Sequence, residues 1–330
     1  MKIAIVQNSF IPAHQYGGTE RVIWGLGKAL VQLGHEVVFI VKQGSHCPFA
    51  PIIPYDSIHD ISQDLPQDID IVHFHSGAVG MEKLTTPYVS TLHGNIYNND
   101  AKLQRNTIFI SQNHAQRFGG QCFVHNGLDW EDYDKPDLKQ SQKFFHFLAK
   151  AAWKVKNVRG AIDLVKSLSD EKLYVLGGYR FNLKMGLRFT FTPKARFFGM
   201  VSNAEKSRYL PQSKGLLFPV LWHEPFGLAV VESLYYGAPV FATPYGSLPE
   251  IVSPEMGFLS NSQSELRHAM QYWGDFNRQH CHDYAREKFS AMRMTKDYLE
   301  KYERVLSGEC LNAVPPRGSE NKRTLLDWLP

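Results

Sequence analysis

The stretch that decides the fold is HEPFGLAVVES, residues 223–233, which holds two carboxylates eight positions apart, Glu224 and Glu232. Pro225 and Gly227 prevent one continuous helix through both acids. We therefore expect Glu224 on a loop and Glu232 in the first turns of a helix that begins near Gly227. The two acids would then face one ligand from different elements.

An isolated pair of acids at this spacing is more often a solvated loop residue and an acid near a helix start, where the dipole favours negative charge. Here the stretch continues into GAPVFAT (237–243) and GSLPEIV (246–252), which together read as helix, strand, glycine turn and helix. This longer pattern resembles the GT-B glycosyltransferases. It is most similar to their large retaining family of the group 1 or family 4 type, whose mark is a Glu, seven residues and a second Glu.

The resemblance extends from the first strand to about Leu306 and implies an α/β GT-B fold. In this fold two Rossmann-like, doubly wound parallel-sheet domains face each other across a cleft. We expect an N-terminal domain at residues 1–140, on the acceptor side, and a C-terminal donor domain at 141–306, whose last helix, 283–306, crosses back. A polar tail, 307–330, falls outside the resemblance and could pack on the body, contact a partner or be disordered.

The apolar pattern separately indicates two α/β units, because 330 residues exceed what one core usually supports. Short runs of buried-strand character alternate with helical segments such as 19–33, which predicts parallel sheets. The expected strands are 3–6, 37–41, 69–74, 88–92, 107–110 and 122–124, and then 144–148, 173–176, 196–198, 216–218 and 239–242.

Composition narrows the functional class. A formal net charge of +4 is too small for the basic footprint of a nucleic-acid-binding protein, although it suits anionic metabolites. The four cysteines are scattered without zinc or redox spacing, which favours reduced thiols and a cytoplasmic location. No apolar run approaches the length of a membrane span, so we expect any membrane contact to be peripheral, at the inner face.

Two glycines, Gly17 and Gly18, lie between the first strand and the helix at 19–33. Backbone N–H groups there can approach a diphosphate closely, and their position matches the phosphate-facing loop of the family. The sequence after the first strand lacks Gly-x-Gly-x-x-Gly, which disfavours a nicotinamide oxidoreductase but leaves it as a fold-level alternative.

Two lysines follow the strand at 144–148. The family commonly has an Arg after this strand and a Lys six residues on, both neutralising the donor diphosphate, and Lys150 and Lys156 occupy these positions. Lys150 departs from the pattern, since a lysine lacks the planar fork of an arginine. Lys154, between them, is expected to be solvated.

Three histidines, His73, His75 and His93, lie at the ends of two expected strands, where a doubly wound sheet opens onto its ligands. The family places a donor-contacting histidine at such a strand end, and His93 is the match. We expect His73 to be structural and leave the role of His75 open.

By resemblance, the catalytic residues would be His93, Glu224 and Lys156, and the reaction would retain the anomeric configuration. Glu232 would bind the ribose hydroxyls, while Glu224 and the backbone of 226–228 (Phe226, Gly227 and Leu228) would position the donor sugar. The leaving phosphate would accept the proton of the acceptor. Lysines and helix ends would replace a metal, because the pair Asp68 and Asp70 precedes its strand and lies at the wrong end of the sheet. No cofactor is therefore expected.

Several points stay open. The donor could be a UDP- or GDP-sugar, and the acceptor a glycan, a lipid-linked sugar or a small molecule. Residues 179–198 interleave basic and aromatic side chains, and we expect a strand with one buried face there rather than a surface for lipid or nucleic acid. A non-catalytic relative that binds sugar or nucleotide as an interaction module is the rival function.

Overall fold

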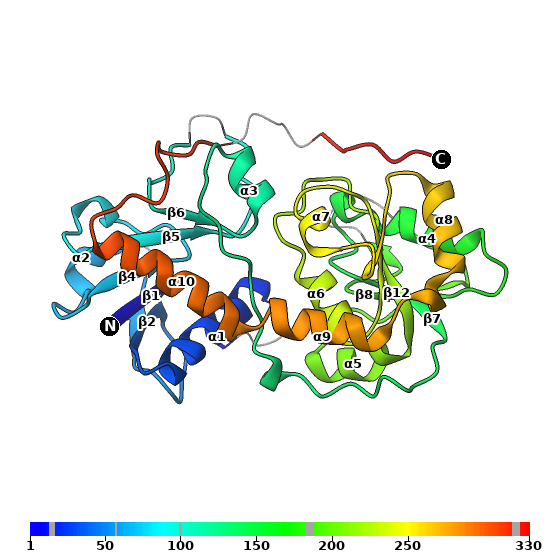
Figure 1. Ribbon diagram of the computed structural model, residues 1–330, viewed down its shortest axis with the longest axis horizontal. Coiled ribbons are helices and arrows are strands. Elements are labelled where there is room, and N and C mark those ends of the chain that lie inside the picture. The colour runs from blue at the N-terminus through cyan, green and yellow to red at the C-terminus, as the bar shows by residue number, and fades with distance from the viewer. Residues whose placement is uncertain (13–16, 57, 99–100, 183–187, 319–323) are drawn as a thin grey trace. The chain divides into compact units, whose positions relative to one another are not determined.

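The computed structural model describes residues 1–12, 17–56, 58–98, 101–182, 188–318 and 324–330 (Figure 1). The chain forms two compact units. Unit 1 comprises Met1–Asp129 and Phe289–Lys322, and unit 2 comprises Trp130–Lys288 and Arg323–Pro330. Each unit contains a six-stranded sheet in which every strand pairing is parallel.

Unit 1 has the strand order β3-β2-β1-β4-β5-β6, the reversal of direction that characterises a doubly wound sheet. Its strands are β1 Lys2–Gln7, β2 Glu36–Lys42, β3 Ile52–Tyr55, β4 Ile71–Phe74, β5 Tyr88–Leu92 and β6 Thr107–Phe109. Its helices are α1 Gly18–Gln32, α2 Ile61–Asp64, α3 Gln112–Arg117 and α10 Ala291–Leu306. The sequence did not predict β3.

Unit 2 repeats the arrangement with the order β11-β8-β7-β12-β13-β14. Its sheet strands are β7 Phe144–Leu148, β8 Leu173–Leu176, β11 Ala195–Phe197, β12 Ser213–Phe218, β13 Val240–Ala242 and β14 Gly257–Leu259. A separate antiparallel pair consists of β9 Phe181–Asn182 and β10 Arg188–Phe189. The helices are α4 Val158–Lys166, α5 Asn203–Tyr209, α6 Leu228–Tyr235, α7 Leu248–Ile251, α8 Gln263–Gln271 and α9 Arg278–Lys288.

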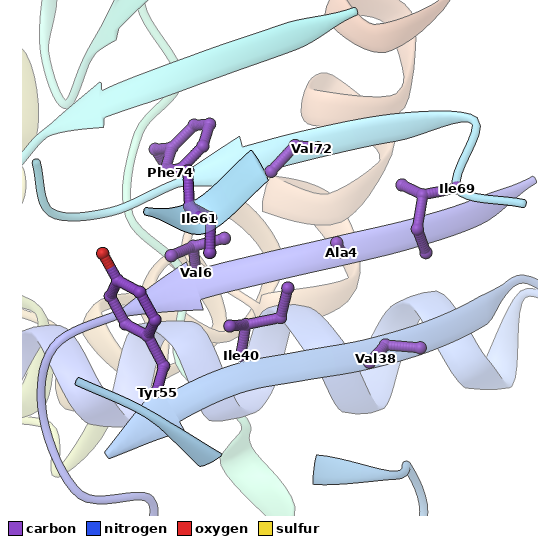
Figure 2. Close-up of a cluster of buried hydrophobic side chains, with 9 residues drawn as sticks. All are labelled: Ala4, Val6, Val38, Ile40, Tyr55, Ile61, Ile69, Val72 and Phe74. Atoms are coloured by element: carbon purple, nitrogen blue, oxygen red, sulfur yellow. The ribbon is translucent and has the colours of Figure 1, made fainter. Parts of the chain in front are cut away.

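Apolar strand residues and helix faces make the core of each unit. One cluster in unit 1 gathers side chains from β1, β2, β4 and α2 (Figure 2). On α1 the glycine at position 27 is needed for packing, because an added Cβ would lie 2.3 Å from the ring of Phe39 on β2. In Figure 1, α1 lies against α10 in unit 1, and α6 lies against α9 in unit 2.

Three local expectations are wrong. Residues 122–124 form no strand, because Phe123 makes only an isolated bridge to Phe109. The expected helix 283–306 is broken between α9 and α10, where Ser290 is extended and its side chain caps α10 by accepting from the Arg293 N–H at 3.2 Å. The described part of 179–198 does not form the expected strand with one buried face, because Phe189 and Phe191 are 51% and 84% exposed.

The division between the units falls at Trp130 because this residue packs on unit 2. Its indole stacks on Tyr235 of α6, with ring centroids 4.2 Å apart and planes 3° from parallel. The tail packs on both units in separate pieces. Asn312 binds unit 1 by donating to the Thr107 carbonyl at 2.8 Å, and residues 324–330 belong to unit 2. Within the described residues, no helix combines the length and the hydropathy that crossing a bilayer requires.

Candidate active site

The loop that carries Glu224 joins β12 to α6 in unit 2. Gly227 ends the loop with φ +97°, a left-handed conformation, and stands at the N-cap of α6, so the helix begins only at Leu228. The backbone of Glu224 pairs with Gly246, and the Ser247 N–H donates to the Glu224 carbonyl at 2.9 Å. The loop is therefore fixed through its backbone, and the helix begins after Gly227 as Pro225 and Gly227 predict.

Gly246 shows how closely the two segments approach. It has φ +69°, and an added Cβ would lie 2.2 Å from the carbonyl oxygen of Glu224. Only glycine meets both requirements without displacement of the loop. The expected glycine turn after β13 thus supports the Glu224 backbone.

Glu224 is 7% exposed, and the Oε2 atom of its carboxylate accepts two hydrogen bonds, one from a charged donor and one from a neutral donor. Lys156 Nζ lies 2.6 Å from this oxygen, and Trp222 Nε1 lies 2.7 Å from it. The ammonium also lies 4.8 Å from the Trp222 ring centroid and 5.1 Å from that of Phe218, distances at which cation–π attraction contributes. The structure therefore brings together Glu224 and Lys156, both singled out from the sequence, and adds Trp222.

A short turn positions Lys156. The 3₁₀ helix Lys154–Lys156 ends at Asn157, whose φ of 52° is left-handed and whose side chain caps α4 by accepting from the Gly160 N–H at 3.0 Å. The carbonyl of Val155 accepts from the Leu221 N–H at 2.7 Å. This bond ties the lysine turn directly to the Glu224 loop.

Lys150 follows β7 and is exposed, with its ammonium 5.5 Å from the ring centroid of Trp153. Among the residues that the structure describes, it forms no ion pair. Its neighbour Ala151 donates to the carbonyl of Gly177 at 2.8 Å, which fixes the backbone after the strand. Lys154 is exposed as expected.

Glu232 occupies a different setting, on the buried side of α6. It is 3% exposed, and its Oε1 accepts from Lys206 Nζ at 2.5 Å and from the Tyr133 hydroxyl at 2.9 Å. The sequence did not single out Lys206 or Tyr133, because a lysine on an amphipathic helix and a tyrosine in a linker carry no local signal. Their pairing depends on how α5 and residue 133 pack against α6.

The residues around the α6 N-terminus are placed as follows. Phe226 is 2% exposed, and its carbonyl accepts from the Ser247 hydroxyl at 2.6 Å. Gly227 is buried, and Leu228 is half-buried as the first residue of α6. The first N–H groups of a helix lack carbonyl partners within it and favour an anion nearby. This end of α6 adjoins Glu224 along the chain.

In unit 1, Gly17 and Gly18 stand at the start of α1. Gly17 is the N-cap, with extended φ of −170°, and Gly18 is the first helical residue. The Arg21 N–H donates to the Gly17 carbonyl at 3.2 Å.

The three histidines form a stack in unit 1. His73 is buried between Tyr302 and Thr91, each 2.7 Å from one ring nitrogen, as expected of a structural residue. His75 Nδ1 lies 2.8 Å from His93 Nε2. Burial lowers the pKa of His93 to about 4 and lowers that of His75 further below its ordinary value, so both rings are neutral at pH 7. His93 could therefore hydrogen-bond a ligand but would not act as a cation.

Asp68 and Asp70 lie at the amino end of the unit 1 sheet, as predicted. Asp68 pairs with the Lys2 ammonium at 2.5 Å, and Asp70 accepts from the Lys2 N–H at 2.7 Å. Both acids have a structural role at the start of β1.

Two parallel, doubly wound sheets, one with an acid–lysine site after its strands, are the architecture that the sequence led us to expect of a GT-B glycosyltransferase. Two family models match the chain: glycosyl transferases group 1 over residues 129–288, and glycosyltransferase family 4 over residues 16–118. The first corresponds to the main segment of unit 2, and the second lies within unit 1. The chain belongs to the group 1 glycosyltransferases.

Similar proteins cover only parts of the sequence. The chain is 32% identical over 114 residues to an uncharacterized 41.2 kDa protein in the cps region of Klebsiella pneumoniae, which is 32% of this chain and 31% of that protein. It is 46% identical over 52 residues to sucrose synthase 1 of Oryza sativa subsp. japonica, 16% of this chain and 6% of that enzyme. The matched segments thus span about a third or less of these relatives.

Solved structures match over nearly the whole chain and show the fold. AviGT4, a glycosyltransferase involved in avilamycin A biosynthesis, has a TM-score of 0.74 at 21% identity, covering 93% of this chain and 98% of that one. Anabaena Alr3699/HepE in complex with UDP and glucose has a TM-score of 0.65 at 15% identity, covering 92% and 99%. Starch synthase IV of Arabidopsis thaliana, bound to ADP and acarbose, has a TM-score of 0.68 at 13% identity, covering 93% and 99%.

Proposed function

We propose that this chain transfers a sugar from a nucleotide-diphosphate sugar to a glycan, lipid-linked or small-molecule acceptor, with retention at the anomeric carbon. The observation that carries the proposal is the ion pair between Glu224 and Lys156. Glu224 lies on the backbone-fixed loop before α6, and Lys156 lies in the turn before α4. Structural neighbours in complex with UDP and glucose, or with ADP, support a nucleotide-sugar donor of this kind.

Lys156 and Lys150 would neutralise the leaving diphosphate without a divalent metal or other cofactor. Lys156 is held in place, 12% exposed in its side chain, whereas Lys150 is exposed and can move toward a ligand. Fixed positive charge near the departing phosphate stabilises the transition state because it needs no reorganisation. The glycines Gly17 and Gly18 at the start of α1 would supply backbone N–H donors to a diphosphate.

Glu224 would position the donor sugar through its carboxylate, assisted by the backbone at 226–228. Its Oε2 pairs with the Lys156 ammonium at 2.6 Å, and a carboxylate acceptor binds a sugar hydroxyl more strongly than a neutral acceptor does. Glu232 would bind the ribose hydroxyls through its carboxylate, which also accepts a hydrogen bond from Lys206. Neutral His93 would donate or accept one hydrogen bond to the donor.

The test is release of nucleotide from a panel of UDP-, GDP- and ADP-sugars, offered with and without candidate acceptors. Glu224→Gln is expected to abolish turnover. Glu171→Gln is the matched control, because Glu171 forms a similar pair with Lys214, 2.7 Å apart, elsewhere in unit 2. Tight donor binding without turnover for every acceptor would support the non-catalytic module, and nicotinamide binding would support an oxidoreductase.

We further propose that the enzyme works in the cytoplasm, in peripheral contact with an anionic membrane through an aromatic patch of Tyr179, Phe181, Phe189 and Phe191. These side chains are 66%, 48%, 51% and 84% exposed, and the ring of Phe189 contacts those of Phe181 and Phe191. Residues 172–204 contain six Lys or Arg and no Asp or Glu, so the surrounding charge complements anionic lipid.

Co-sedimentation with vesicles tests this contact. The chain is expected to bind vesicles that contain phosphatidylglycerol and not vesicles of phosphatidylcholine alone, and the double variant Phe189→Ser with Phe191→Ser is expected to lose binding. Phe258→Ser, at another exposed phenylalanine of unit 2, is the control. Equal binding to both vesicle types, or preferential binding of single-stranded nucleic acid, would contradict the proposal.

A further inference from the structure

Residues 324–330, here called the strap, run along unit 2 and are held by main-chain hydrogen bonds. The Leu326 N–H donates to the Leu221 carbonyl at 2.9 Å. Further along, the Leu329 N–H donates to Asn261 and the Leu329 carbonyl accepts from Gln263, both at 2.8 Å. The strap thus has an ordered place on unit 2 although the family resemblance does not extend to it.

One strap contact leads directly to the Glu224–Lys156 pair. Leu221 accepts from the strap through its carbonyl and donates through its N–H to Val155, at 2.7 Å, in the turn that carries Lys156. The next residue, Trp222, donates its indole N–H to Glu224 at 2.7 Å. Leu221 therefore links the strap to both members of the pair.

A second contact reaches the same loop from the other side. The Tyr245 hydroxyl donates to the Asp327 carbonyl at 2.8 Å. Tyr245 precedes Gly246, whose backbone pairs with Glu224, and Ser247, whose N–H donates to the Glu224 carbonyl. The strap consequently holds the segments on both sides of Glu224.

The strap buries little apolar surface of its own. Leu325 and Leu329 are 51% and 49% exposed, and Asp327 is exposed. Because core burial supplies most of the stability of a unit, loss of the strap would cost little global stability and would chiefly loosen the segments that it binds. Its contacts go to two places, the segments beside Glu224 and the start of α8 around residues 261–264, and not to the core.

We infer that the strap is a positioning element of the donor site, which holds Leu221 and Tyr245 so that Glu224 and Lys156 keep their geometry. The inference rests on the proposed function. A donor that must contact both Glu224 and Lys156 binds more weakly when either segment shifts. The rate also falls, because a displacement of about 1 Å can cost on the order of 100-fold. Acceptor binding is not affected by this mechanism.

The experiment compares Leu326→Pro, which removes the N–H that binds Leu221, with Leu326→Ala, which keeps it. Leu325→Pro is the matched proline control, since it leaves the Leu326 N–H intact. Leu326→Pro is expected to raise the donor KM roughly 3- to 10-fold with the acceptor KM unchanged, by partial loss of site geometry. Tyr245→Phe is expected to act in the same direction, while both controls match the parent chain.

Hydrogen exchange measured on the same variants separates the strap from the proposed function. Faster exchange at the amides of Leu221 and Ser247 in Leu326→Pro, with the core of β12 unchanged, is expected whether or not a donor is turned over. If the parent chain turns over a donor and Leu326→Pro changes neither the donor KM nor these exchange rates, the strap inference is overturned while the function stands. If no donor is turned over, the proposed function fails and unchanged exchange alone overturns the strap.

Discussion

The two glutamates of the 223–233 stretch sit in two contrasting Glu–Lys pairs. The Glu224–Lys156 pair joins two loops, with side chains 8% and 12% exposed, and its atoms are held by main-chain bonds on both flanks. The Glu232–Lys206 pair joins two helices, with side chains 4% and 7% exposed, and is closed by Tyr133. The first pair has the accessible loop setting of a binding site, whereas the second has the setting of a packing interaction.

The comparison shows that Glu224 and Glu232 have different roles although they belong to one sequence motif. Breaking the helical pair leaves a charge that cannot reach water without separating α5 from α6. Breaking the loop pair leaves a carboxylate that keeps the Trp222 N–H, in a pair whose side chains are more exposed, 8% and 12% against 4% and 7%. Loss of stability and loss of activity should therefore divide between the two pairs.

The largest effect is expected from Lys206→Met, which leaves the Glu232 carboxylate buried without its cation. Removal of one partner of a buried pair costs about 3–5 kcal/mol. Urea unfolding of the variant measures this loss. The double variant Lys206→Met with Glu232→Leu is expected to recover much of it, and an unchanged midpoint for the single variant would show that the helical pair contributes no stability.

Lys156→Met is expected to lower kcat/KM by about 100- to 1,000-fold, because a fixed charge at the leaving diphosphate is lost. Its unfolding free energy should fall less than that of Lys206→Met, since Glu224 keeps the Trp222 N–H and is more exposed than Glu232. Steady-state kinetics and urea unfolding on one preparation give both values. A stability loss equal to that of Lys206→Met would remove the distinction between the pairs.

Gly246→Ala probes the backbone support of the loop pair. The added Cβ would clash with the Glu224 carbonyl and force a residue other than glycine into a left-handed conformation. A strain of about 1–3 kcal/mol is expected, together with reduced turnover. Gly274→Ala, where nothing lies within 4 Å of the added Cβ, is the control and should match the parent chain in thermal unfolding and in rate.

The smallest effect concerns pH and the helical side of the comparison. His146 is buried between Ser213 and Ser233, and Ser233 follows Glu232 in the chain. Burial lowers the pKa of His146 from 6.5 to about 3. The unfolded chain takes up a proton below about pH 6.5 that the folded chain refuses. Stability from this neutral ring is thus complete above pH 6.5 and is lost toward pH 3, by at most about 1.4 kcal/mol per pH unit.

Urea unfolding at pH 7.5 and pH 5 checks this dependence. His146→Gln, which keeps a hydrogen-bonding side chain but cannot take up the proton, is expected to lose less stability between the two pH values than the parent chain. Parallel losses in both chains would contradict the assignment of the pH effect to His146.

Much of the fold could be predicted from the sequence because its signals are local. The apolar runs of β1, β2 and β7 and the periodic face of α1 identify themselves, and Gly227 marks the start of α6. Signals fail where structure depends on packing. The break between α9 and α10 at Ser290 has helical periodicity on both sides, and β3 has no run of its own that stands out from a loop.

The sequence predicts candidate site residues but not the contacts between them. Pro225, Gly227 and Gly246 indicate a fixed turn around Glu224, and Lys156 follows from the family resemblance. Trp222 lies only two residues before Glu224, but no local pattern marks its indole N–H as the donor. Lys206 and the strap come from distant positions with no spacing rule. Their contacts arise only when the parallel strands bring the loops to one edge of the sheet.

The central claim is that Glu224 and Lys156 together receive the donor. A crystal structure of the chain soaked with the nucleotide sugar that the turnover panel selects tests it most directly. The account predicts the Glu224 carboxylate within hydrogen-bond distance of the donor sugar and the Lys156 ammonium against the diphosphate. A bound nucleotide remote from both side chains, with their ion pair unchanged, would contradict it.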